Sequence, residues 1–157
     1  MIVRGLVDED FVNYKVPSMF VVFPYCSFKC EKDCGIKCCQ NSAVALSPQI
    51  NVDVDNLVER YIQNPITHAI VFGGLEPLDS YGDVLELVAA LRESTQDPIV
   101  LYTGYTEEEA ATYVKGLQTF TNIIVKFGRF IPDRPHHIDE LLGVELASDN
   151  QYAKKIS

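Results

Sequence analysis

Five cysteines crowd into one short stretch of this chain, and they constrain its fold and chemistry more than any other feature. All of them lie between residues 26 and 39 of a 157-residue sequence. The five are Cys26, Cys30, Cys34, Cys38 and Cys39. Thiolates at such short separations converge readily on one soft metal ion or one iron–sulfur cluster. The spacing therefore predicts a metal or cluster site.

A disulfide framework fits these cysteines less well. Their number is odd, which leaves one thiol unpaired in any intramolecular scheme. The N-terminal MIVRGLVDEDFVNY lacks the charged start, the apolar run and the small-residue cleavage site of a secretory signal. We therefore expect a cytoplasmic protein whose thiols stay reduced.

Composition narrows the class of protein further. The net charge of −9 disfavours nucleic-acid binding, which depends on clustered Lys and Arg. Apolar runs are short and interrupted by charge or proline, so no membrane span is expected. The length and the lack of repeats or linkers predict a single domain over residues 1–157, with a protein or a small molecule as partner.

Strand-like and helix-like segments alternate along the chain. Apolar, β-branched or aromatic runs predict strands at residues 18–25, 67–72, 99–103 and 120–127. Helical spacing predicts helices capped by Asp53, by Ser80, and by Thr106 in a capping box with Glu109. Near the end, residues 136–143 suggest a short helix and residues 144–147 a last strand. This alternation predicts an α/β fold built on a parallel sheet.

The chemically distinctive residues all follow predicted strands. The cysteine loop comes after the first strand, the GGLEP segment of residues 73–77 after the second, and the TGY segment of residues 103–105 after the third. Parallel strands place their carboxyl ends at one edge of the sheet, where ligands of α/β folds bind. We expect these loops to form one site.

The motifs and their order resemble the radical S-adenosylmethionine (SAM) superfamily. The resemblance rests on a strand leading into CSFKC, on the CQN that follows, and on the double glycine with Glu-Pro. The YTGY of residues 102–105 and the SDNQ of residues 148–151 make the chain most similar to the activating proteins of anaerobic ribonucleotide reductase. The resemblance implies an incomplete parallel β/α barrel of the radical SAM type that holds a [4Fe-4S] cluster and binds SAM.

The same resemblance implies an activity and partners. Such an oxidoreductase cleaves SAM reductively to a 5′-deoxyadenosyl radical, which takes a hydrogen atom from a glycine of a partner enzyme. The implied partners are a glycyl radical enzyme, such as anaerobic ribonucleotide reductase, and a low-potential reductant such as flavodoxin or ferredoxin. Neither nucleic acid nor a membrane is expected.

Cluster ligands in this superfamily follow a C-x3-C-x2-C arrangement that leaves one iron open to SAM. Cys26 and Cys30 match the first two ligands. For the third ligand we favour Cys39, because Gln-Asn follows it, and residues 31–38 then form an insertion. Cys34 is the alternative third ligand or an additional one, and Cys38 fits least well.

The resemblance also implies the residues that contact SAM. The superfamily's GGEP motif appears here with Leu75 inserted before the glutamate. The implied cofactor-binding residues are Gly73, Gly74, Glu76, Thr103, Gly104, Tyr105 and Asn150.

A non-catalytic protein is the alternative reading of the same cysteines. If Cys34 joined Cys26, Cys30 and Cys39 on the cluster, every iron would be filled and SAM would have no open site. Such a protein would carry electrons, as ferredoxins do, or four thiolates would hold a zinc ion.

Overall fold

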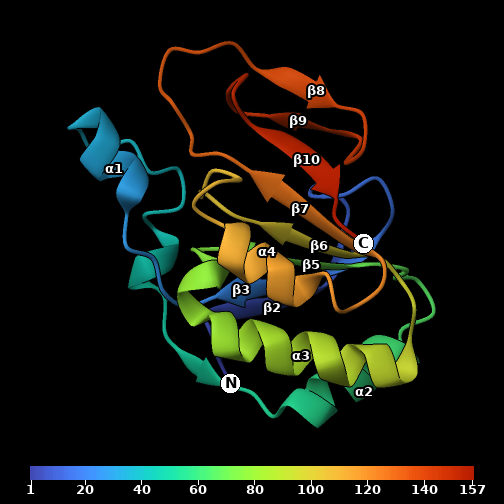
Figure 1. Ribbon diagram of the computed structural model, residues 1–157. Helices are drawn as coiled ribbons and strands as arrows, with labels where there is room; N and C mark the ends of the chain where they lie inside the picture. Colours follow the sequence, from blue (N-terminus) through green and yellow to red (C-terminus); the bar gives the residue numbers. More distant parts are fainter.

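A six-stranded sheet forms the centre of the structure, a computed structural model that describes residues 1–157 (Figure 1). The strand order is β10-β7-β6-β5-β3-β2. The four inner strands are parallel to one another and correspond to the four predicted strands. They are β3 (Ser18–Phe23), β5 (Ile70–Gly74), β6 (Ile99–Tyr102) and β7 (Ile123–Phe127). The four strand predictions are thus confirmed.

Both outer strands run antiparallel to their neighbours, and the sequence predicted neither. β2 (Gly5–Asp10) pairs with β3, and β10 (Tyr152–Lys155) pairs with β7. Both strands are partly exposed, so they lack the apolar runs by which buried parallel strands are recognised. The sheet is open at both edges. Its assignment as a partial barrel of the radical SAM type stays a prediction.

Three helices cover one face of the sheet (Figure 1). They are α2 (Val54–Gln63), α3 (Tyr81–Ser94) and α4 (Ala111–Leu117). Their apolar sides pack with Phe23, Phe72 and Phe127 of the sheet in the main hydrophobic core. Because side chains alternate along a strand, the residues that neighbour each of these phenylalanines in its own strand point to the other face of the sheet.

Two of the three predicted caps form their hydrogen bonds. The Asp53 carboxylate accepts a hydrogen bond from the Asn56 amide at 3.0 Å, which caps α2. Thr106 and Glu109 exchange both bonds of the predicted capping box, at 2.9 and 3.2 Å, ahead of α4, which begins at Ala111. Ser80 is the N-cap residue of α3, as predicted, but it also ends the 3₁₀ turn η2 (Pro77–Ser80) and its hydroxyl makes no capping bond.

A β-hairpin covers part of the opposite face, and it replaces a helix that the sequence suggested. Its strands are β8 (His137–Asp139) and β9 (Val144–Leu146), of which β9 was predicted. The helix predicted at residues 136–143 is wrong. The Asp139 carboxylate accepts the Leu142 amide at 2.9 Å, and the Asp139 carbonyl accepts the Gly143 amide at 2.7 Å. With Gly143 at φ 71°, these bonds favour a turn over a continuing helix.

The remaining elements are short. They are β1 (Ile2–Val3), α1 (Lys29–Cys34), η1 (Val44–Leu46) and β4 (Ile50–Asn51), and β1 pairs with β4. No helix combines the length and the apolar character needed to cross a bilayer.

Candidate functional site

A single cleft of about 470 Å³ lies at the carboxyl ends of the parallel strands. This volume falls within the range of ordinary small-molecule sites. The loops after β3, β5, β6 and β7 all contribute to its lining, as the parallel topology requires. The predicted site residues that line it are Cys26, Cys30, Cys39, Gly73, Gly74, Glu76, Thr103, Gly104 and Tyr105. Cys34 and Asn150 do not line it.

Three of the five cysteines face this cleft. They are Cys26, Cys30 and Cys39. Burial raises the pKa of Cys26 to about 11, and burial together with the neighbouring Cys39 raises the pKa of Cys30. The Cys26 sulfur also accepts the Phe28 amide at 3.2 Å, with Phe28 in the left-handed region at φ 52°. Backbone N–H bonds to ligand sulfurs are among the contacts that tune iron–sulfur clusters, so this thiol suits a cluster ligand.

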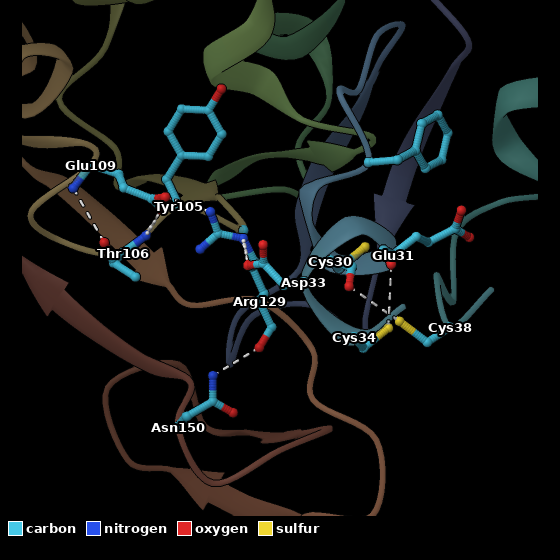
Figure 2. Close-up of polar contacts among 12 residues, drawn as sticks. Cys30, Glu31, Asp33, Cys34, Cys38, Tyr105, Thr106, Glu109, Arg129 and Asn150 are labelled. Carbon is cyan, nitrogen blue, oxygen red and sulfur yellow. Dashed lines mark hydrogen bonds and ion pairs between the residues drawn. The ribbon is translucent and has the colours of Figure 1, made fainter. Parts of the chain in front are cut away.

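The other two cysteines, Cys34 and Cys38, lie outside the cleft and bond to backbone carbonyls (Figure 2). The neighbouring Cys34 thiol is the main cause that raises the pKa of Cys38 to about 12. The Cys34 thiol donates to the Ile36 carbonyl at 3.3 Å, and the Cys38 thiol to the Cys30 carbonyl at 3.6 Å. The helix α1 and the Gly35 turn that ends it thus leave three thiols at the cleft and two outside it.

Hydrogen bonds fix the cysteine loop to its neighbours at the sheet edge. The Asp79 carboxylate accepts the Ser27 amide at 2.7 Å and the Tyr105 hydroxyl at 2.5 Å. At the other end of the loop, Asn41 donates its side-chain amide to the Gly74 carbonyl at 2.8 Å. Asp79 therefore joins three loops, and nothing in its sequence context marked it for this role.

The double glycine lets the chain pass where a side chain would collide. A Cβ on Gly74 would lie 2.4 Å from a Val22 methyl group, and Gly74 has φ 84°. A Cβ on Gly73 would lie 2.9 Å from the Phe20 ring. Contacts this short do not occur between real side chains, so Gly74 requires glycine, whereas a side chain at Gly73 would have to displace the Phe20 ring.

Substitution of Gly74 is expected to unfold the sheet edge. We predict that Gly74→Ala lowers the free energy of unfolding by at least about 2 kcal/mol, from the positive φ and the collision with Val22. Gly82→Ala is the matched control, because Gly82 lies in α3 with open space around it. Urea titration of both variants measures the difference, and equal stabilities would refute the steric argument.

Glu76 is buried beneath the cleft and binds three protein donors. Its carboxylate accepts the Thr103 hydroxyl and the Gly104 amide, both at 2.8 Å, and the Leu78 amide at 3.1 Å. Burial raises the pKa of Glu76, and these three hydrogen bonds oppose that rise. The predicted SAM contacts Glu76, Thr103 and Gly104 are thus bonded to one another, and Glu76 ties the second loop to the third.

Three cations line the cleft of this acidic protein, and the sequence analysis identified none of them. Lys29 lies over the Tyr105 ring, 3.7 Å from its centre. Arg129 pairs with Glu109 at 2.5 Å and with Asp33 of α1 at 3.1 Å (Figure 2). The third cation is Lys126 of β7. Arg129 therefore links α1 to the capping box ahead of α4.

The SDNQ segment supports the loop that carries Arg129. Asn150 donates to the Arg129 carbonyl at 2.8 Å (Figure 2). Gln151 donates to the Gly128 carbonyl at 3.2 Å. Gln151 lines the cleft, whereas Asn150 does not. A cofactor contact for Asn150 stays a prediction, and its observed partner is the protein backbone.

No group of three or more His, Cys, Asp and Glu side chains has the arrangement that holds one metal ion. A four-iron cluster is larger than a single ion and separates its ligands further.

Comparison with known proteins indicates a [4Fe-4S] cluster. A family model described as "4Fe-4S single cluster domain" matches residues 17–150. The matched segment runs from the start of β3 into the SDNQ segment and contains every cysteine. No curated protein and no solved structure matches the chain.

Proposed function

We propose that this chain, which belongs to the 4Fe-4S single cluster domain family, is a radical SAM enzyme that activates a glycyl radical partner. The family membership establishes a 4Fe-4S protein. The proposal adds that three thiols hold the cluster and that the fourth iron is open to SAM.

The sorting of the cysteines is the observation that carries this proposal. Cys26, Cys30 and Cys39 line the cleft, whereas Cys34 and Cys38 lie outside it and donate to backbone carbonyls. Three ligands leave one iron without a protein thiolate. When bound, such a cluster supplies the electron that breaks a C–S bond of SAM.

The protein's own residues prepare the space beside the cluster. Gly73 and Gly74 bring bare backbone to the cleft wall, where a ligand approaches closely. Glu76 and Asp79 hold the three loops in register through hydrogen bonds of 2.5 to 3.1 Å. Rigid positioning of this kind is what a protein contributes when a cofactor performs the chemistry.

A macromolecular substrate is part of the proposal. The 157 residues form the central sheet, its covering helices, a hairpin and the loops around the cleft. A large partner that covers the cleft completes the proposal. A glycyl radical enzyme and a low-potential reductant such as flavodoxin or ferredoxin fill these roles.

Release of 5′-deoxyadenosine tests the proposal. Anaerobically reconstituted protein, given SAM and dithionite, is expected to form methionine and 5′-deoxyadenosine in equal amounts, measured by liquid chromatography. Cys30→Ala should reduce this to background, because it removes a ligand, whereas Cys38→Ala should leave it unchanged. A fully loaded cluster that yields no 5′-deoxyadenosine would refute the enzyme and favour an electron carrier.

The four-thiolate carrier is tested by the spectrum of the reduced cluster. Cys34 follows Cys30 by one turn of α1 and lies on the same side of that helix. To join the cluster it would have to leave its bond to Ile36. SAM perturbs the electron paramagnetic resonance spectrum only if one iron is open, so an unchanged spectrum identifies the carrier.

A further inference from the structure

Lys126 is a buried cation that the proposed function does not use. It lies in β7, with its neighbours Val125 and Phe127 in the core on the helix side of the sheet. Alternation along the strand places Lys126 on the opposite face, where it lines the cleft. Only 6 % of the residue is exposed.

The ammonium group has one protein acceptor. Its Nζ donates to the Gly128 carbonyl at 2.8 Å. An ammonium carries three donors, so two of them have no protein partner. No carboxylate lies within ion-pairing distance of Nζ, and the Tyr102 ring centre is 5.9 Å away.

Glu76 is the acidic group that raises the pKa of Lys126, and its carboxylate already has hydrogen-bond donors in the protein. Glu76 raises the pKa of Lys126, but burial outweighs it and lowers that pKa to about 8. The Glu76 carboxylate accepts bonds from Leu78, Thr103 and Gly104, so it is held away from Nζ. A buried charge without a counter-ion is unfavourable, and a protein retains one most readily where a ligand supplies the opposite charge.

We propose that Lys126 binds the carboxylate of a ligand that enters the cleft between β7 and the β8–β9 hairpin. The hairpin lines this part of the cleft through Glu145 and Leu146. A carboxylate fits better than a phosphate, because Lys126 is a single cation without an anionic partner, and its ring contact with Tyr102 at 5.9 Å is longer than that of Lys29 with Tyr105 at 3.7 Å. Arg129 is engaged by Glu109 and Asp33, and Lys29 by Tyr105.

The carboxylate has two sources, SAM or a second ligand such as a side chain of the partner. The inference needs only the carboxylate and does not depend on SAM cleavage. Its test therefore has one arm that uses a simple carboxylate and one arm that uses SAM.

The first arm compares acetate with chloride and with acetamide, its neutral analogue, in thermal unfolding of the anaerobic holoprotein. At equal ionic strength, acetate is expected to raise the melting temperature of the wild type above that in chloride or acetamide. Lys126→Met should abolish this shift. It should still fold, because an apolar side chain of similar size replaces an unpaired charge. Lys155→Met, which removes an exposed lysine of β10, should respond as the wild type does.

The second arm measures binding of SAM and of decarboxylated SAM by equilibrium dialysis. If SAM supplies the carboxylate, Lys126→Met weakens SAM binding by about 10- to 100-fold, the loss typical of a charged hydrogen bond, and leaves the decarboxylated analogue unaffected. If acetate stabilises only proteins that retain Lys126 while SAM affinity is unchanged, a second ligand is the source. Either result supports the carboxylate site.

The inference and the proposed function fail in different ways. If neither acetate nor SAM distinguishes Lys126→Met from the wild type, the carboxylate site is refuted, even where the wild type binds and cleaves SAM. If the wild type binds no SAM but acetate stabilises it through Lys126, the enzyme proposal falls and the carboxylate site stands.

Discussion

Replacing Cys39 with serine is expected to leave the protein without a complete [4Fe-4S] cluster. Cys39 lines the cleft beside Cys30, and these two thiols lie close enough to raise the pKa of Cys30. Serine keeps the size of the side chain but removes the soft thiolate that iron requires. Iron content, acid-labile sulfide and the visible absorption of the reconstituted protein should fall to background, and 5′-deoxyadenosine formation should disappear with them.

The matched controls are Cys34→Ser and Cys38→Ser, which alter neighbouring thiols of the same loop. Both should retain the full cluster and the SAM-dependent change in the electron paramagnetic resonance spectrum, because both thiols bond to carbonyls outside the cleft. If Cys34→Ser lost the cluster while Cys39→Ser kept it, the ligand assignment would be wrong. If both variants lost it, four thiolates would hold the cluster and the protein would be a carrier.

The sequence predicted the inner sheet because buried parallel strands have a simple signal. Runs such as the IVF of β5 and the IIV of β7 are apolar on both faces, and no polar loop imitates them. The outer strands β2 and β10 carry charges, since one of their faces meets solvent, and the same signal is absent there. Strand β8 was missed because an Asp139 turn interrupts a segment with helical spacing.

Within the site, the sequence indicated the cysteines and the paired glycines but not the common charged residues. Cysteines and paired glycines are informative in any context, whereas Asp79 and Arg129 acquire their roles only when distant loops meet. Lys126 had a usable signal, because a lysine within the apolar run IIVKF marks a position where the strand must either meet solvent or bury a charge. The division of the five thiols was predicted from the resemblance, through the Gln-Asn that follows Cys39, whereas its structural cause, the turn at Gly35, was not.

Removing the carboxylate of Glu76 is expected to be among the most damaging single changes outside the cysteines. Three donors point at this group, from Leu78, Thr103 and Gly104, and only 5 % of the residue is exposed. Glu76→Ala leaves these donors without an acceptor and opens a cavity beneath the cleft. Each unsatisfied buried group costs about 1 to 3 kcal/mol, so we expect a loss of about 3 to 5 kcal/mol in the free energy of unfolding.

Glu76→Gln separates hydrogen bonding from volume. Glutamine fills the same space, but its amide nitrogen must replace one carboxylate oxygen and then faces a donor. We expect a loss of about 2 kcal/mol, smaller than for alanine, since one acceptor oxygen remains. Glu108→Gln is the control, because Glu108 is exposed and its side chain makes no hydrogen bond, so its effect should stay within about 0.5 kcal/mol.

The two possible roles of Glu76 predict different responses in the ligand-free protein. If Glu76 only contacted SAM, its loss would weaken SAM binding and leave the free protein unchanged. Because its oxygens bond to the Gly104 and Leu78 amides, both amides should instead exchange their hydrogens faster in Glu76→Ala before any ligand is added. Unchanged protection of these amides, together with wild-type stability in urea, would show that Glu76 does not hold the loops together. Faster exchange confined to these loops would identify it as the link that holds the second and third loops in place around the cleft.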